Sequence, residues 1–183
     1  MLASLAIPSE LMAQPEPWLR GILPGLHPVT AHLIRSTLHI HEDLSQALLP
    51  LTTEQLWSKP HGMTSAGFHA KHLAGSTERL CTYLEGKQLS PRQLAEIPLE
   101  AQGKESPAEL VAKAASALAH YETLVRTLPP EAFASIREIG RKKLPTTAIS
   151  LAIHIAEHGQ RHAGQAVSAA KLSQAISPRE DRE

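Results

Sequence analysis

Four stretches of this chain place apolar residues three and four positions apart, the spacing that puts them on one face of an α-helix. The four stretches span residues 27–49, 64–84, 106–128 and 146–172. Pro50 follows the first stretch and Gly86 follows the second, as expected at helix ends. No stretch shows the sustained alternation of apolar and polar residues expected of a strand. We therefore predict an all-α fold, a four-helix bundle.

The composition supports helices. The chain has only two Trp, two Tyr and two Phe, so Ala and Leu must fill most of the core, which suits helices better than sheets. The predicted connections of roughly 13 to 20 residues are longer than a simple up-and-down bundle needs. They therefore favour a crossover topology, and we expect residues 130–145 to be irregular.

The length of 183 residues predicts one folded domain. We expect a proline-rich extension at residues 1–24, the bundle at residues 25–173 and a polar tail at residues 174–183. The proline-rich start lacks a positively charged leader, and no run of apolar residues is long enough to span a membrane. The expected location is the cytoplasm.

Charge and cysteine content exclude several classes of function. Lys and Arg total 18, as do Asp and Glu, so the net charge of zero argues against a nucleic-acid binder or a basic membrane-surface protein. The partner expected instead is a small-molecule substrate. The single cysteine, Cys81, excludes an intrachain disulfide and a Cys-rich metal site, and we expect it to be a buried small apolar residue.

Histidine is the unusual residue type, with 11 in the chain. His69 and His72 lie in the predicted second helix, in FHAKHL. His154, His158 and His162 lie in the fourth, in HIAEHGQRH. Residues four apart lie one above the other on a helix, so two of these imidazoles can share a metal ion.

A helical wheel indicates which histidines face the bundle. With His154 at zero, His158 and His162 fall at about 40° and 80°, towards the small apolar face. This geometry prefers His158 and His162 as ligands and leaves His154 at the edge. On the second helix, His69 and His72 both face inward, and the wheel does not choose between them.

Three imidazoles without a thiolate or carboxylate suit Zn, Ni, Fe or Cu rather than Mg or Ca. Three protein ligands leave a coordination position open, as in catalytic sites. A metal there would activate a water molecule or a thiol. The alternative from the residues alone is that the inward histidines are hydrogen-bonded core or pocket residues.

Two segments resemble the DinB/YfiT-like superfamily. The run HIAEHGQRHAGQ, residues 154–165, is similar to the last helix of that family, with His158, His162, Gly164 and Gln165 in the matching pattern. Residues 64–86 are similar to its second helix, with His72 in the matching position. The resemblance covers roughly residues 27–172.

The resemblance implies a four-helix bundle of down-up-up-down type, often a homodimer, that binds one divalent metal, commonly Zn or Ni. By position, the metal ligands it implies are His72, His158 and His162. Characterised relatives include S-transferases that use a low-molecular-weight thiol as cosubstrate. We expect the pocket around the metal to be lined by a wider group of residues: His69, His154, Ser76, Arg79, Tyr83 and Gln165.

The leading hypothesis is a metal-dependent thiol S-transferase that acts on small electrophilic molecules, with activation by the bound metal. One alternative is a metal-dependent hydrolase that uses metal-bound water. Another is a non-catalytic metal-binding or ligand-binding bundle. That last alternative predicts a closed site, with His69 or His154 as a fourth ligand.

Overall fold

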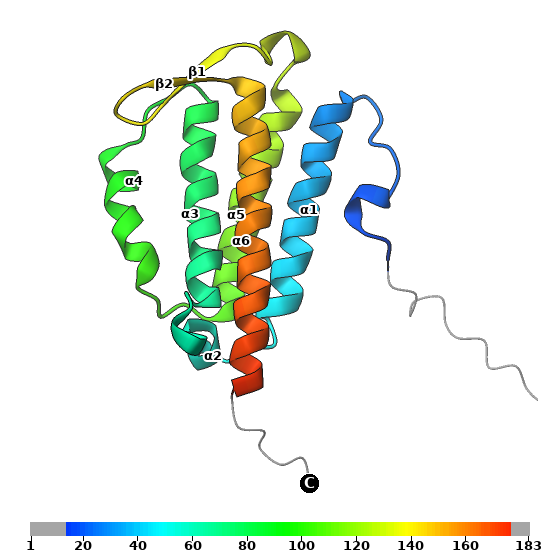
Figure 1. The fold of residues 1–183 in the computed structure, drawn as a ribbon. Helices are drawn as coiled ribbons and strands as arrows, with labels where there is room; N and C mark the ends of the chain where they lie inside the picture. The colour runs from blue at the N-terminus through cyan, green and yellow to red at the C-terminus, as the bar shows by residue number, and fades with distance from the viewer. Residues whose placement is uncertain (1–13, 177–183) are drawn as a thin grey trace, which may run out of the picture.

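The computed structural model describes residues 14–176, and four long helices form its body (Figure 1). These are α1 (Pro28–Leu48), α3 (Ala66–Leu84), α5 (Pro107–Thr127) and α6 (Ala148–Ile176). The predicted all-α four-helix bundle is therefore confirmed, and the predicted helix limits lie within a few residues of these. Residues 1–13 of the predicted extension and 177–183 of the predicted tail lie outside the described residues.

Shorter elements connect the long helices. They are η2 (Pro17–Leu19), α2 (Thr53–Trp57), η3 (Pro60–Gly62), α4 (Pro91–Glu96), η4 (Ile97–Ala101), η5 (Pro130–Ala132), β1 (Ile136–Ile139) and β2 (Leu144–Thr147). The connection between α3 and α5 holds α4 and η4, two short helices that the apolar spacing in the sequence did not indicate. No helix among residues 14–176 combines the length and apolar character needed to cross a lipid bilayer.

Side-chain caps fix where the long helices begin. The Ser65 hydroxyl accepts a hydrogen bond from the Phe68 amide at the start of α3. Ser106 and Glu109 form a reciprocal capping box at the start of α5. The Thr147 hydroxyl accepts from the Ser150 amide at the start of α6. Each cap satisfies an amide that the helix itself leaves without a partner.

The helices run down, up, up and down in chain order, as the resemblance implied (Figure 1). Each long helix packs against two others, in the cyclic order α1, α5, α3, α6. The bundle therefore has four seams between neighbouring helices. The α3–α6 seam and the α1–α5 seam lie opposite each other.

Small residues on α6 bring its backbone close to its neighbours. Ala156, Gly159 and Ala163 are buried along one face of the helix. A Cβ atom added at Gly159 would lie 2.7 Å from Cδ1 of Ile40 in α1. The α1–α6 seam thus depends on the missing side chain at this position.

The expectation of an irregular segment over residues 130–145 is wrong. β1 and β2 form an antiparallel hairpin in which Ile136 pairs with Thr147 and Ile139 pairs with Leu144. The hairpin crosses the end of the bundle where α3 ends and α6 begins (Figure 1). Nε of Arg137 donates to the carbonyl of Leu84 and so satisfies the last turn of α3.

The chain ends differ modestly from the prediction. α6 continues to Ile176, so residues 174–176 of the predicted tail are helical. Of the predicted extension, residues 14–24 lie against α1 as an ordered segment, where Arg20 forms an ion pair with Glu42. Cys81 is fully buried, as expected.

Candidate metal centre

Three imidazoles meet at the α3–α6 seam. His72 comes from α3, and His158 and His162 lie one turn apart on α6. One ring nitrogen from each lies within 4.8 Å of the other two, and all three side chains are partly buried. The structure therefore brings together the three residues that the sequence put forward as ligands.

The spacing of the nitrogens fits a shared ion. Nε2 of His72 and Nε2 of His158 are 3.2 Å apart. Two ligands at about 2.05 Å from a tetrahedral zinc ion have nitrogens about 3.4 Å apart. The donor set is three imidazoles, which suits zinc or nickel rather than magnesium or calcium.

A buried carboxylate fixes the orientation of His72. Nδ1 of His72 lies 2.7 Å from Oε2 of Glu100, so the ring donates its Nδ1 proton to the carboxylate and keeps Nε2 free as a ligand. Nη1 of Arg79 donates to the other carboxylate oxygen at 2.6 Å. Burial alone would raise the pKa of Glu100, but the hydrogen bonds from His72 and Arg79 outweigh it and hold that pKa below its usual value.

Glu100 reaches the site because η4 is anchored to α3. A Cβ atom at Gly75 would lie 2.4 Å from Oε1 of Glu100, so the missing side chain makes room for the carboxylate. Just beyond η4, Nζ of Lys71 donates to the carbonyl of Gln102. Nε1 of Trp57 donates to the carbonyl of Glu105.

His69 of α3 contacts the ring of His162. Nδ1 of His69 lies 3.1 Å from Nδ1 of His162, which leaves Nε2 of His162 for the ligand role. The structure thus separates the two histidines that the wheel left equal. His72 belongs to the triad, whereas His69 lies outside the group of mutually close nitrogens and contacts the ring of His162.

Three histidines of the seam, His69, His158 and His162, favour the neutral form that metal ligation requires. Burial, followed by the charge of His72, lowers the pKa of His158 and of His162 to about 4. Burial and His72 also lower the pKa of His69. Arg161 contributes a smaller lowering at both His158 and His162, so its charge acts on the triad.

Comparison with known proteins identifies the family. The sequence pattern of the DinB superfamily matches residues 37–166, most of the bundle. The chain belongs to the DinB superfamily. The solved structures include a similar one, YfiT from Bacillus subtilis, described as a probable metal-dependent hydrolase with an unusual four-helix bundle topology. It is 17% identical, with a TM-score of 0.58, over 82% of this chain and 91% of YfiT. No curated protein matches the chain.

The other predicted pocket residues of this DinB chain have different surroundings. His154 is exposed, and its ring centroid lies 5.7 Å from that of His158. Gln165 lines a cavity of about 690 Å³ that His69 and Arg161 also border. Arg79 acts on the triad through Glu100.

Ser76 and Tyr83 were also expected to line the pocket. The Ser76 hydroxyl donates to the Leu73 carbonyl within α3, and Tyr83 packs in an apolar core cluster. Among residues 14–176, the structure gives neither of them a hydrogen bond or ring contact with the triad.

Sequence reasoning missed two residues at this DinB site. Phe68 stacks on His72 with ring centroids 5.6 Å apart, and its position one turn before His72 is a signal that could have found it. Glu100 lies 28 positions from His72, in a segment without helical periodicity. Arg79, which the structure buries, is a signal for a buried acidic partner, but it does not show which residue that partner is.

Proposed function

We propose that this DinB-superfamily chain binds one divalent transition metal, zinc or nickel, through His72, His158 and His162. The observation that carries the proposal is the open three-histidine site, in which His72 and His162 each have the second ring nitrogen engaged by a neighbour. Of the described residues, three imidazoles and not four lie within ligand range, which argues against the closed, non-catalytic site.

We further propose that the protein is a thiol S-transferase. When bound, the metal supplies Lewis-acid activation that lowers the pKa of a low-molecular-weight thiol. The sulfur forms a bond to an electrophilic carbon, the leaving group departs with its electron pair, and the thiol proton passes to solvent.

The cavity beside His69 supports a small-molecule substrate. Its volume of about 690 Å³ lies within the range of small-molecule sites. Arg161 and Gln165 supply polar contacts at its wall, and the described residues give Arg161 no ion-pair partner. The guanidinium is therefore available to an anionic group on the thiol or the electrophile.

Metal-dependent hydrolysis is the second candidate, because YfiT is described as a probable metal-dependent hydrolase. Both activities use the same triad. They differ in one measurable property, the dependence of turnover on added thiol.

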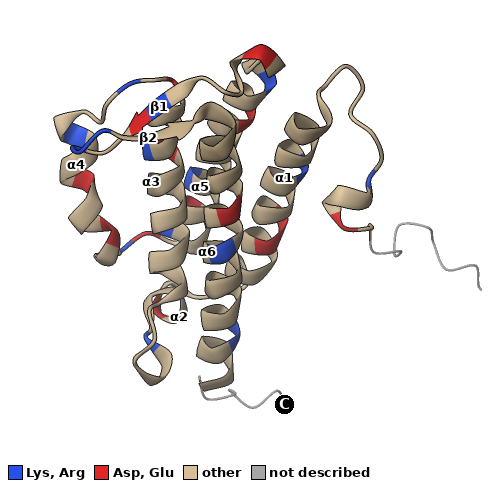
Figure 2. Ribbon diagram, turned by 45° about the horizontal axis from the view of Figure 1, so that its top comes forward, with Lys and Arg blue, Asp and Glu red and all other residues tan. Residues whose placement is uncertain are grey.

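Other parts of the proposal concern partners and location. Acidic and basic residues are mixed along the long helices (Figure 2), and the net charge is zero, which supports a protein that does not bind nucleic acid. An apolar hollow between α1 and α6, bordered by Leu33 and Ile153, supports a homodimer through this seam. We also propose a cytoplasmic location without membrane association.

The first test measures metal content by elemental mass spectrometry of the untagged full chain after incubation with Zn²⁺ or Ni²⁺. We expect about one ion per chain in the wild type and less than a tenth of that in His162→Ala. The matched control is His154→Ala on the same helix, which should keep its metal. A wild type that takes up neither metal contradicts the proposal.

The second test uses the metal-loaded protein with 1-chloro-2,4-dinitrobenzene and either bacillithiol or mycothiol, and separately with p-nitrophenyl acetate without thiol. Thioether formation that requires both metal and thiol supports transfer. Ester cleavage that requires metal but no thiol supports hydrolysis. Metal binding without either activity contradicts the transferase proposal and leaves the metal site intact.

A further inference from the structure

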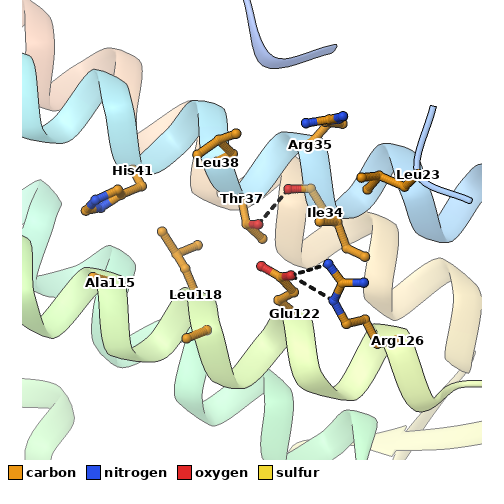
Figure 3. Close-up of a pocket in the computed structure, with 11 residues that line it drawn as sticks. Leu23, Ile34, Arg35, Thr37, Leu38, His41, Ala115, Leu118, Glu122 and Arg126 are labelled. Atoms are coloured by element: carbon orange, nitrogen blue, oxygen red, sulfur yellow. Dashed lines mark hydrogen bonds and ion pairs between the residues drawn. The ribbon is translucent and has the colours of Figure 1, made fainter. Parts of the chain in front are cut away.

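A second cavity lies on the opposite side of the bundle from the triad. It has a volume of about 340 Å³ and lies in the α1–α5 seam (Figure 3). The triad lies in the α3–α6 seam, and no triad residue borders this cavity. The volume falls at the lower end of the range for small-molecule sites.

The wall of this cavity holds unsatisfied polar atoms. Within residues 14–176, the only buried side-chain nitrogens or oxygens without a hydrogen-bond partner are Nε of Arg35 and Nδ1 of His41. Both residues line this cavity. Because native proteins pair nearly all buried polar groups, two unpaired nitrogens beside one cavity indicate a partner from outside the chain.

The cavity also carries one cation without a counter-ion. The Arg35 guanidinium donates to the carbonyls of Arg20 and Gly21, and no described carboxylate lies within ion-pair range of it. Arg126 on the facing helix is different, because its Nε and Nη2 both bind Glu122. Figure 3 shows this pair extending from α5 towards α1. The unneutralised charge at Arg35 favours a ligand with one negative charge.

The rest of the wall is apolar except for Thr37, whose hydroxyl donates to the carbonyl of Ile34. Leu38 of α1 and Leu118 of α5 border the cavity, and Ala115 and Ala119 leave space along α5. A ligand that fits these surroundings has an acidic group at one end and a hydrocarbon body.

We infer that the α1–α5 cavity is a second ligand site, separate from the histidine triad, and that it binds a small amphipathic monocarboxylate. The carboxylate contacts Arg35, and the hydrocarbon chain lies between Leu38 and Leu118. His41, six residues further along α1, supplies a polar contact about 9 Å along the helix axis from Arg35.

The test uses isothermal titration of the full chain with octanoate and with 1-octanol, which share a chain length and differ in the acidic group. We expect saturable one-to-one binding of octanoate and about tenfold weaker binding of octanol. Arg35→Gln should weaken octanoate by about tenfold and leave octanol unchanged. Arg92→Gln is the matched control, since that exposed cation lies outside the cavity, and it should have little effect.

A second pair of variants locates the site without removing a charge. Ala119→Leu fills the cavity from α5 and should abolish octanoate binding. Ala108→Leu makes the same change at an exposed position near the start of the same helix, outside the cavity, and should leave binding unchanged. His162→Ala should also bind octanoate normally, because the triad lies in the other seam.

Three outcomes overturn the inference. They are no saturable binding of octanoate by the wild type, equal binding by Ala119→Leu and Ala108→Leu, or equal affinity for octanoate and octanol. Circular dichroism of each variant confirms that a loss of binding is not a loss of fold.

Discussion

At the scale of single residues, the chain Arg79–Glu100–His72 determines how the triad is presented. Glu100 is buried and receives hydrogen bonds from both neighbours, so one carboxylate fixes both a ring orientation and its tautomer. A metal ligand whose second nitrogen is held by a carboxylate is also a more basic ligand. Glu100 therefore acts on metal binding without contacting the ion.

Glu100→Gln should lower metal affinity by about 10- to 100-fold, because the amide removes the charge that polarises His72. The measurement is competition with a chelator of known affinity. Glu96→Gln is the control, since Glu96 pairs only with the exposed Arg92. Equal metal affinities in the two variants would show that Glu100 has a purely structural role. A urea titration of the metal-free proteins measures that structural role as a change in the free energy of unfolding.

The triad was predictable because two of its members lie four residues apart on a helix, a spacing visible in the sequence. The choice between His69 and His72 did not follow from the helical wheel, because both face the seam, and it rested on the family resemblance, which implied His72. Glu100 was not predictable either, since its approach depends on how η4 packs over Gly75. The role of the three histidines as ligands stays a prediction.

At the scale of elements, the two glycines of α6, Gly159 and Gly164, differ in how closely neighbouring residues pack against them. Gly159 lies buried against Ile40 of α1, whereas a Cβ atom at Gly164 would meet nothing within 4 Å. Only the first glycine is required by packing. The second lies beside the cavity that borders His69.

Gly164→Ala should raise the free energy of unfolding by about 0.5–1 kcal/mol, because alanine loses less backbone entropy in a helix. Gly159→Ala should be about 1 kcal/mol less stable than Gly164→Ala, since its new methyl group displaces Ile40. Urea denaturation of the metal-free proteins measures both. Equal stabilities would mean that the α1–α6 seam does not depend on close backbone approach.

The long helices were predictable from apolar spacing and from caps such as Ser106, whereas the hairpin was not. β1 and β2 have four residues each, and Pro145 lies inside β2. Strands this short do not establish an alternating pattern. The two strands pair where they pack over the ends of α3 and α6. That packing is a tertiary contact, which local sequence patterns do not show.

At the scale of the whole molecule, burial in the α3–α6 seam disfavours the charged forms of His158 and His162. Burial lowers the pKa of His158 and His162 to about 4, whereas an imidazole in an unfolded chain has a pKa of about 6.5. Below pH 6.5 the unfolded chain therefore binds more protons than the folded chain. The free energy of unfolding must fall as the pH falls towards 4.

For the metal-free protein we expect a loss of about 1–2 kcal/mol between pH 6.5 and pH 4, a value reduced for the partial exposure of both rings. Urea titrations across this pH range measure it. The double variant His158→Gln, His162→Gln should show a flatter dependence. If its dependence matches that of the wild type, other groups cause the loss.

The down-up-up-down order also separates the triad along the chain. His72 and His158 are 86 residues apart, and α3 must pack against the last long helix, α6, before the seam is complete. Because closing a loop of this length costs conformational entropy, we expect an ion that joins these residues to bind at a late stage of folding. Contacts that form so late change the unfolding rate more than the folding rate. A bound metal would therefore lengthen the lifetime of the folded protein without hastening its formation.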